Sequence, residues 1–423
     1  MTNVIKRHVD IAVIGAGPGG LGAAIRAKEE GAKDVVLVER AEELGGILPQ
    51  CIHNGFGLHY FGEELSGPAY AHKLIKKVEK SGVEVLTHTM AIDLDSTGKI
   101  TAANNKGIME IIPRAVILCM GCRERSRGAL MIPGERPAGI FTAGTAQRLI
   151  NIEGSLPGKK VLILGSGDIG MIMARRLILE GAEVPAVIEL LPFIGGLVRN
   201  EVQCLNDFNV PTYTKHTVTH IMGEERLERV EVAEVGADRK PLAGTEKVFD
   251  CDTLLLSVGL IPENELSLMA GVKLNPLTGG PLVDEFWQTS VPGIFVGGNV
   301  LHVHDLADYV TESSEQAASN AVRYISSNKK VADSKITIKA GKNIRYVVPN
   351  SISASNPVSF YLRIAWPLNK PTISIGDIYQ KKINYYLRPS EQIRLDVPAD
   401  RFQNLNNSIR ELVVSCEGEE VTF

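Results

Sequence analysis

The chain has 423 residues, 44% of them hydrophobic and 22% charged, with a net charge of −4. These values are ordinary for a globular protein and exclude a basic nucleic-acid-binding surface, and no apolar run reaches the roughly 18 residues that a membrane span needs. Six cysteines are too few for a disulfide framework, so we expect a reducing, cytoplasmic setting.

A glycine loop lies between a predicted buried strand at residues 10–14 and a predicted helix at residues 21–30. It matches GxGxxG, whose glycines allow a tight turn, close approach of a pyrophosphate and close packing of helix on strand. These glycines are Gly15, Gly17 and Gly20. The helix N-terminus can bind the phosphates, and Glu39, after a further predicted strand at residues 35–38, can bind a ribose diol.

A second glycine loop repeats this arrangement between a predicted strand at residues 160–164 and a predicted helix at residues 171–179. Its glycines are Gly165, Gly167 and Gly170. In both copies the acid lies 19 positions after the last glycine, and here it is Glu189. Two such copies predict two dinucleotide sites, and the alternative is a pair of purely structural turns. A carboxylate at Glu189 favours a free ribose 2′-hydroxyl, so we predict NAD(H) over NADP(H).

The paired loops resemble the flavoproteins with two dinucleotide-binding domains, the group that includes glutathione reductase and thioredoxin reductase. The resemblance covers about residues 8–326 and implies an α/β fold of two doubly wound, Rossmann-like domains. FAD would bind a domain formed by residues 1–148 and 252–326, and NAD an inserted domain at 149–251. The resemblance also implies further FAD contacts, at Arg40, Gly45, Gly46, Gly121, Gly298 and Asn299; the last stands where relatives usually carry aspartate.

The redox dithiol of glutathione-reductase relatives is absent, because Cys51 is followed five residues later by Phe56 rather than by a second cysteine. The resemblance places Cys51 and His53 near the flavin, where they could tune it or meet an electron acceptor. The alternative is a loop that only packs around the cofactor, because structural cysteines outnumber reactive ones. Cys119 and Cys122 form a CxxC that is either a redox pair or structural.

His302 and His304 follow Asn299 and precede a predicted helix at about residues 305–325. This helix is expected to point its N-terminus at the flavin, where its dipole stabilises a reduced, anionic ring. We expect His304 on the flavin or substrate side; otherwise both histidines belong to a polar turn. No metal site is predicted.

Four sequence runs narrow the resemblance, namely QCIHNGFG, RPAGIFTAGTAQ, LGSGDIG and GNVLHVHDLADYV. They are similar to the NAD/FAD subunits of heteromeric flavin dehydrogenases, including opine oxidases, hydrogen cyanide synthase and above all complexes with a glycerol-3-phosphate dehydrogenase-like flavoprotein. This implies an oligomeric complex in which the chain passes electrons between NAD(H), FAD and a partner flavoprotein dehydrogenase subunit, accompanied by a small CxxC protein. The alternatives are a stand-alone NADH-dependent reductase of a disulfide or other small acceptor, and a non-catalytic nucleotide-binding scaffold.

The last part of the chain differs in composition, since only three of the 41 glycines fall in residues 331–423. Residues 326–334 are polar and predict a linker. Beyond them apolar residues alternate with polar ones in about seven short runs, which predicts an all-β, sandwich-like domain at 335–423. This domain carries no cofactor motif, and we expect it to dock a partner subunit or a second copy. The alternative is an appended domain that only covers the body.

Overall fold

The computed structural model describes residues 5–327, 336–402, 405 and 409–421. They form two compact units, the first from the described parts of Met1–Cys122 and Pro262–Val421, the second from Arg123–Ile261. The chain leaves the first unit in β9 (Cys122–Glu124) and returns to it in β18 (Leu260–Pro262). No helix among the described residues combines the length and the hydropathy of a membrane span.

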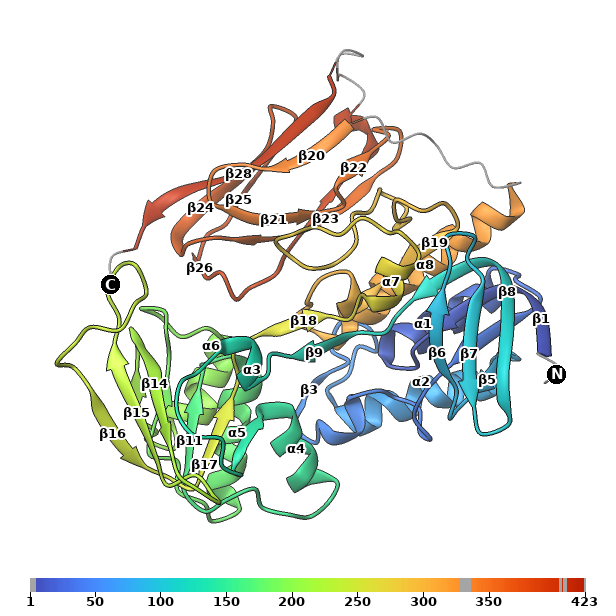
Figure 1. Ribbon diagram of the computed structural model, residues 1–423. Coiled ribbons are helices and arrows are strands. Elements are labelled where there is room, and N and C mark those ends of the chain that lie inside the picture. Colours follow the sequence, from blue (N-terminus) through green and yellow to red (C-terminus); the bar gives the residue numbers. More distant parts are fainter. Residues whose placement is uncertain (1–4, 328–335, 403–404, 406–408, 422–423) are drawn as a thin grey trace. The chain divides into compact units, whose positions relative to one another are not determined.

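The first unit contains a seven-stranded sheet, whose labelled strands include β1, β5, β6, β7 and β8 in Figure 1. In the order β5-β2-β1-β8-β7-β6, with β19 also on β8, its strands are β5 (Glu84–Leu86), β2 (Val35–Val38), β1 (Ile5–Ile14), β8 (Gly107–Leu118), β7 (Ile100–Asn104), β6 (Met90–Leu94) and β19 (Ile294–Val296). β1 is parallel to β2 and β8, and its last four residues are buried, as expected for a strand covered on both faces.

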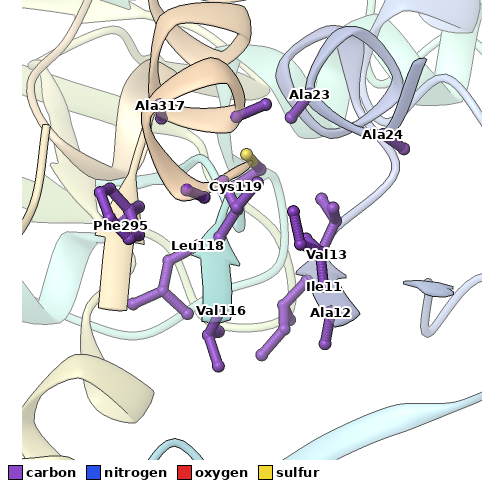
Figure 2. Packing of buried hydrophobic residues seen from close by; sticks show 14 of the residues in the cluster. Ile11, Ala12, Val13, Ala23, Ala24, Val116, Leu118, Cys119, Phe295 and Ala317 are labelled. Carbon is purple, nitrogen blue, oxygen red and sulfur yellow. The ribbon is translucent and has the colours of Figure 1, made fainter. Parts of the chain in front are cut away.

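Helices α1 (Pro18–Glu29) and α8 (Ala307–Ser326) pack against each other beside this sheet. A Cβ on Gly19 would lie 2.6 Å from Ser314 Oγ, and one on Gly22 would lie 2.6 Å from Thr311 Cγ2. These glycines therefore set how closely the helices approach. Figure 2 shows buried side chains from β1, β8, β19 and both helices meeting in one core, Cys119 among them.

The second unit is a parallel five-stranded sheet with a smaller antiparallel one. The parallel strands, in the order β10-β17-β11-β12-β13, are β10 (Ile140–Thr142), β17 (Thr253–Leu256), β11 (Val161–Leu164), β12 (Val187–Ile188) and β13 (Thr212–Tyr213). The antiparallel sheet contains β14 (His216–Met222), β15 (Arg229–Glu234) and β16 (Lys247–Asp250). The main helices are α4 (Ala143–Asn151) and α5 (Asp168–Leu179).

This unit begins earlier than the NAD domain predicted at 149–251. The reason is that β10 pairs with β17, so residues 140–142 belong to the second sheet and α4 follows them. The functional limits of the two nucleotide domains stay a prediction.

The C-terminal β domain, which comprises the described residues of 336–421, is built from two sheets (Figure 1). The two sheets share one apolar core. The larger contains β20 (Ile336–Ala340), β22 (Ser351–Ile352), β24 (Leu368–Ile375), β25 (Tyr379–Lys382), β26 (Tyr386–Leu387) and β28 (Glu411–Glu420). The smaller contains β21 (Ile344–Val348), β23 (Val358–Ile364) and β27 (Ile393–Val397). Residues 328–334 of the predicted linker lie outside the described residues.

The remaining elements are short, apart from helix α2. They are η1 (Leu48–Gln50), β3 (Asn54–Phe56), β4 (Leu65–Ser66), α2 (Gly67–Ser81), α3 (Arg127–Leu130), α6 (Val198–Asn200), the π-helical turn η2 (Glu201–Asn206), α7 (Glu265–Met269), η3 (Gly298–Val300) and η4 (Ala399–Phe402). Together with the two sheets flanked by helices and the β-rich end, they give the predicted fold class.

Candidate flavin and nucleotide sites

The first glycine loop joins the end of β1 to α1. Gly15 has a φ of +95°, and a Cβ there would lie 2.6 Å from the Cys119 carbonyl oxygen; a Cβ on Gly20 would overlap the Gly15 carbonyl. Gly17 differs, because the nearest atom to a Cβ there is Gly46 Cα at 3.9 Å. Among the described residues no side chain caps the N-terminus of α1, so its N–H groups are available to an anion. The loop therefore fits a pyrophosphate.

Glu39, at the end of β2, is 8% exposed and is held by the loop itself. Ala16 N–H donates to Oε2 at 2.7 Å, and Ala41 N–H donates to Oε1 at 2.8 Å. Each carboxylate oxygen can accept a further hydrogen bond, so the acid can both brace the loop and bind a ribose diol. Arg40, beside it, is exposed.

The second glycine loop has the same construction between β11 and α5. Gly165 has a φ of +96°, and a Cβ there would overlap the Ser257 carbonyl oxygen. Glu189 is 7% exposed and accepts from Ser166 N–H at 2.9 Å, as Glu39 does from Ala16. It also accepts from Ser166 Oγ at 2.5 Å and from Leu191 N–H at 2.7 Å. The structure thus places the two predicted acids in equivalent positions.

The other glycines predicted at the cofactors lie where the chain turns or packs closely. Four of them have left-handed backbones, which strain a side chain, and these are Gly45, Gly46, Gly121 and Gly298. Gly167 and Gly170 lie against Ser257, with a Cβ 3.3 Å and 2.8 Å from its Oγ. Their roles in binding stay predictions.

Cys51 follows η1 and is buried. Its thiol donates to the Ile47 carbonyl at 3.4 Å, and burial raises the pKa of Cys51 to about 12. His53 is half-buried, with Nδ1 2.9 Å from the Asn54 carbonyl oxygen. Sequence reasoning missed Asp308 in the first turn of α8, which accepts from Gly57 N–H at 2.9 Å and ties this loop to the helix. A protonated, buried thiol favours a packing role for Cys51 over a reactive one.

Cys119, at the end of β8, is also buried, and burial raises its pKa to about 12. Cys122 is half-buried, and Asn299 Nδ2 lies 3.7 Å from its Sγ. None of the six cysteines, all of which the structure describes, is in a disulfide. The CxxC therefore combines one residue of the core with one that is partly exposed.

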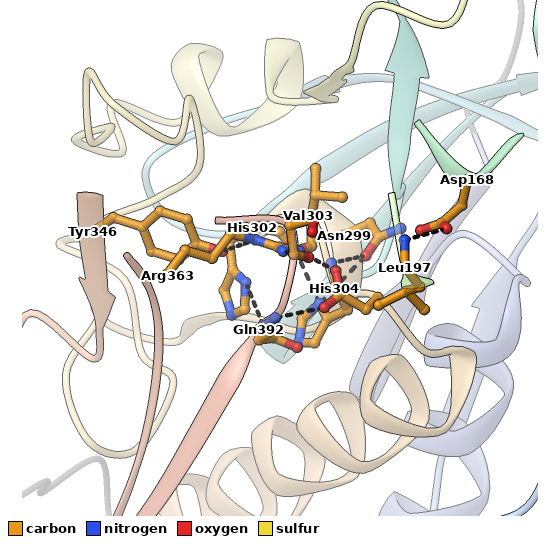
Figure 3. A network of polar contacts seen from close by, with 11 residues as sticks. Asp168, Leu197, Asn299, His302, Val303, His304, Tyr346, Arg363 and Gln392 are labelled. Carbon is orange, nitrogen blue, oxygen red and sulfur yellow. Dashed lines mark hydrogen bonds and ion pairs between the residues drawn. The ribbon is translucent and has the colours of Figure 1, made fainter. Parts of the chain in front are cut away.

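Asn299 lies in η3, and its side chain holds the turn that leads to α8 (Figure 3). His304 N–H donates to Asn299 Oδ1 at 2.9 Å, and His304 Nδ1 lies 3.0 Å from the His302 carbonyl oxygen. The two imidazoles stack with centroids 4.1 Å apart. Burial lowers the pKa of His304 to about 3 and that of His302 well below its usual value, so both rings are neutral. Within the described residues neither Nε2 atom has a hydrogen-bond partner.

These features fit FAD. The first unit holds three features of such a site, along the elements that the flavoprotein resemblance assigns to the cofactor. They are the uncapped N-terminus of α1, Gly17, where a Cβ would meet no atom closer than 3.9 Å, and the buried Nε2 of His304. Within the described residues no cluster of three or more histidine, cysteine, aspartate or glutamate side chains could hold a metal ion.

Comparison with curated proteins gives relatives of similar identity. An opine oxidase subunit of Agrobacterium tumefaciens is 26% identical over 69% of this chain and 61% of its own length. A hydrogen cyanide synthase subunit of Pseudomonas protegens is 24% identical over 68% and 65%. An alkyl hydroperoxide reductase subunit of Pseudomonas putida is 27% identical over 70% and 54%. The chain spans less than two thirds of the length of these relatives.

Solved structures and a family match agree with the predicted fold. Thioredoxin reductase of T. acidophilum aligns with a TM-score of 0.62 at 23% identity, covering 75% of this chain and 98% of that one. An NAD-dependent persulfide reductase from A. fulgidus aligns with a TM-score of 0.58 at 20% identity, covering 92% and 71%. The pyridine nucleotide-disulphide oxidoreductase family matches residues 9–323. The chain therefore belongs to this family.

Proposed function

We propose that the chain transfers electrons between NAD(H) and FAD and exchanges them with a partner flavoprotein as one subunit of a multicomponent dehydrogenase. Bound FAD supplies the redox chemistry, and the chain holds and orients the two nucleotides. The observation that carries the proposal is the pair of equivalent buried acids, Glu39 and Glu189, each braced by an amide of its own glycine loop. Two of the relatives are named as subunits of an oxidase and a synthase, which supports a partner. The six cysteines, none of which is in a disulfide, support a reducing compartment, which we propose is the cytoplasm.

We propose NAD(H) as the nucleotide of the second unit. Glu189 is buried and surrounded by donors, so a 2′-phosphate would meet a fixed negative charge there. The test is an absorbance titration of the purified flavoprotein with each nucleotide under anaerobic conditions. NADH should bleach the flavin at far lower concentration than NADPH; the reverse order would overturn the assignment, and flavin that neither nucleotide bleaches would favour a non-catalytic scaffold.

We propose that the partner is a glycerol-3-phosphate dehydrogenase-type flavoprotein, accompanied by a small CxxC protein. The support is the similarity of the four runs around the predicted flavin and nucleotide sites, for example GNVLHVHDLADYV from Gly298. Co-purification from the native cell with identification of partners tests this. The purified complex should reduce NAD with glycerol 3-phosphate, whereas the isolated chain should not; a complex with no such activity would exclude this substrate.

A second candidate is a stand-alone disulfide reductase. The family name, the likeness to thioredoxin reductase and the partly exposed Cys122 favour it. The buried thiol of Cys119, with its raised pKa, argues against it. Under this proposal the purified chain alone would reduce a disulfide with NADH, and Cys119→Ser and Cys122→Ser would each abolish that turnover while leaving flavin bleaching unchanged.

A further inference from the structure

The C-terminal β domain contacts the turn that precedes α8 through a buried arginine. Arg363 of β23 is 9% exposed and forms an ion pair with Asp305. Its guanidinium also donates to the Val303 carbonyl oxygen at 3.2 Å and to Tyr346 Oη at 3.1 Å. Because a buried charge is costly unless paired, these contacts fix the turn at residues 302–305 against the β domain.

Gln392, just before β27, makes further contacts with the same turn. Its backbone N–H donates to Asp305 Oδ2 at 2.6 Å, and its side-chain Nε2 lies 3.1 Å from His302 Nδ1 (Figure 3). His302 in turn stacks on His304, and its carbonyl oxygen accepts from His304 Nδ1. A continuous series of contacts therefore runs from Gln392 through the histidines to Asn299.

The contacts of His304 determine which of its nitrogens carries hydrogen. Nδ1 lies 3.0 Å from the His302 carbonyl oxygen and 3.3 Å from Asn299 Oδ1, which already accepts the His304 backbone N–H. Both oxygens can only accept, so Nδ1 bears the hydrogen and Nε2 has a bare lone pair. Within the described residues this buried acceptor has no donor. An oxidised flavin has a ring N–H and ribityl hydroxyls that could donate to it.

We infer that Gln392 and Arg363 are positioning residues through which the C-terminal β domain completes the flavin site. They fix the turn whose His302 carbonyl oxygen accepts from His304 Nδ1, and this leaves His304 Nε2 as an acceptor. This rests on FAD binding to the first unit. The β domain then has a role other than docking a partner or covering the body. Its residues Arg363 and Gln392 hold a turn that lies about 60 to 90 positions earlier in the chain, on the flavin side.

The test measures FAD affinity by titrating apoprotein with FAD and following the loss of flavin fluorescence. Gln392→Ala and Gln392→Glu both remove the donor to His302 but keep the backbone bond to Asp305. Each should raise the dissociation constant about tenfold and shift the absorption maxima of the bound flavin. Two control variants keep the turn intact: Ser353→Ala loses a hydrogen bond between the same β domain and Glu285, and Gln380→Ala truncates an exposed glutamine of β25. Both should stay within twofold of wild type.

Nitrogen-15 NMR of histidine-labelled protein gives a second readout, which should show His304 with hydrogen on Nδ1. Affinities and spectra of the Gln392 variants equal to those of Ser353→Ala would overturn the proposal, as would hydrogen on His304 Nε2. If Gln392→Ala fails to fold, the isosteric Gln392→Glu carries the test. The titration uses FAD alone, so its result stands even if NADH fails to bleach the flavin and the proposed electron transfer is wrong.

Discussion

The two buried acids provide matched substitutions at the scale of single residues. Glu189 accepts hydrogen bonds from two backbone N–H groups and one hydroxyl. In Glu189→Gln an amide NH2 group, which can only donate, faces some of these donors. Charged hydrogen bonds contribute about 1.5–3 kcal/mol, so NADH affinity should fall about tenfold or more while FAD affinity stays unchanged. Calorimetric titration with each nucleotide measures both. Glu39→Gln is the reciprocal control, because it should weaken FAD alone; equal effects on both nucleotides would contradict separate sites.

Thiol alkylation measures the state of the cysteines. Burial raises the pKa of Cys51, Cys119 and Cys251 to about 12, so their thiolate fractions are very small at pH 8. Native protein treated with iodoacetamide at pH 8 should leave these three unlabelled, and protein unfolded in urea should label all of them. Mass spectrometry of tryptic peptides distinguishes the sites. Rapid labelling of Cys51 in the native state would instead favour a reactive role for Cys51 at the flavin.

Buried His304 predicts a loss of stability in acid. Its pKa falls from 6.5 to about 3 on folding, so its contribution is complete above pH 6.5 and is lost as pH falls toward 3. In that window the unfolded state binds one more proton, and the free energy of unfolding drops by about 1.4 kcal/mol per pH unit. Between pH 7.5 and 5.5, which spans the unfolded pKa, the total fall in the free energy of unfolding measured with urea should be about 1.4 kcal/mol smaller in His304→Gln. An equal fall in both proteins would mean that the ring is protonated when folded.

The positions of the two acids could be predicted from local sequence, whereas the environment of His304 could not. The acid 19 residues after each loop follows from the strand–helix–strand pattern, and the structure places both acids at their loops. The neutral state of His304 could not be predicted in the same way, because it depends on burial against Tyr361, which lies 57 residues further along the chain.

At the scale of elements, the contact between α1 and α8 depends on glycine. Gly22→Ala would place a methyl 2.6 Å from Thr311 Cγ2, and such overpacking costs about 1–3 kcal/mol, more than the roughly 1 kcal/mol that alanine gains in helix propensity. Thermal unfolding should therefore show a lower midpoint. Gly128→Ala in α3, where the nearest atom to a Cβ is 3.8 Å away, is the control and should not lower it. An unchanged midpoint for both would mean that α8 shifts freely.

Strands and helices follow from sequence more readily than their pairing. The helix predicted at 305–325 is α8 (Ala307–Ser326), and the period of two in the C-terminal part predicts strands where β23 and β27 lie. Sequence periodicity does not show that β23 pairs with β27, or that Arg363 turns toward Asp305. Those contacts join distant segments and depend on which faces pack together.

At the scale of the whole molecule, the C-terminal β domain packs as part of the first unit. Tyr346, Val348 and Tyr361 lie in the same buried cluster as the central sheet, and Glu285 accepts from Ser353 N–H at 2.7 Å. Truncation after Ser327 would expose this cluster. A truncated chain that forms no complex would therefore fit two roles of the domain. The domain could dock a partner, or it could cover the body and support the proposed flavin site.

The two units predict two unfolding transitions with different ligand responses. Anything that binds only the folded state stabilises it by mass action, so FAD should raise the midpoint of the first unit and NAD that of the second. Hydrogen exchange with mass spectrometry, at increasing urea, assigns each transition to its peptides. Peptides of β23 and β27 should open with those of β1. Their opening at much lower urea would show that the β domain is an independent appendage.

The path of the chain through the units also sets an order for synthesis. The first unit needs β19, which lies beside β8, and α8, which covers α1, and both follow Ile261 in the sequence. The second unit is continuous from Arg123 to Ile261 and has all its strands once that stretch has emerged. On the ribosome the second unit can therefore fold before the first unit, whose synthesis begins earlier. Meanwhile β8 remains without β19, and the nascent chain exposes a sheet edge that a chaperone could protect.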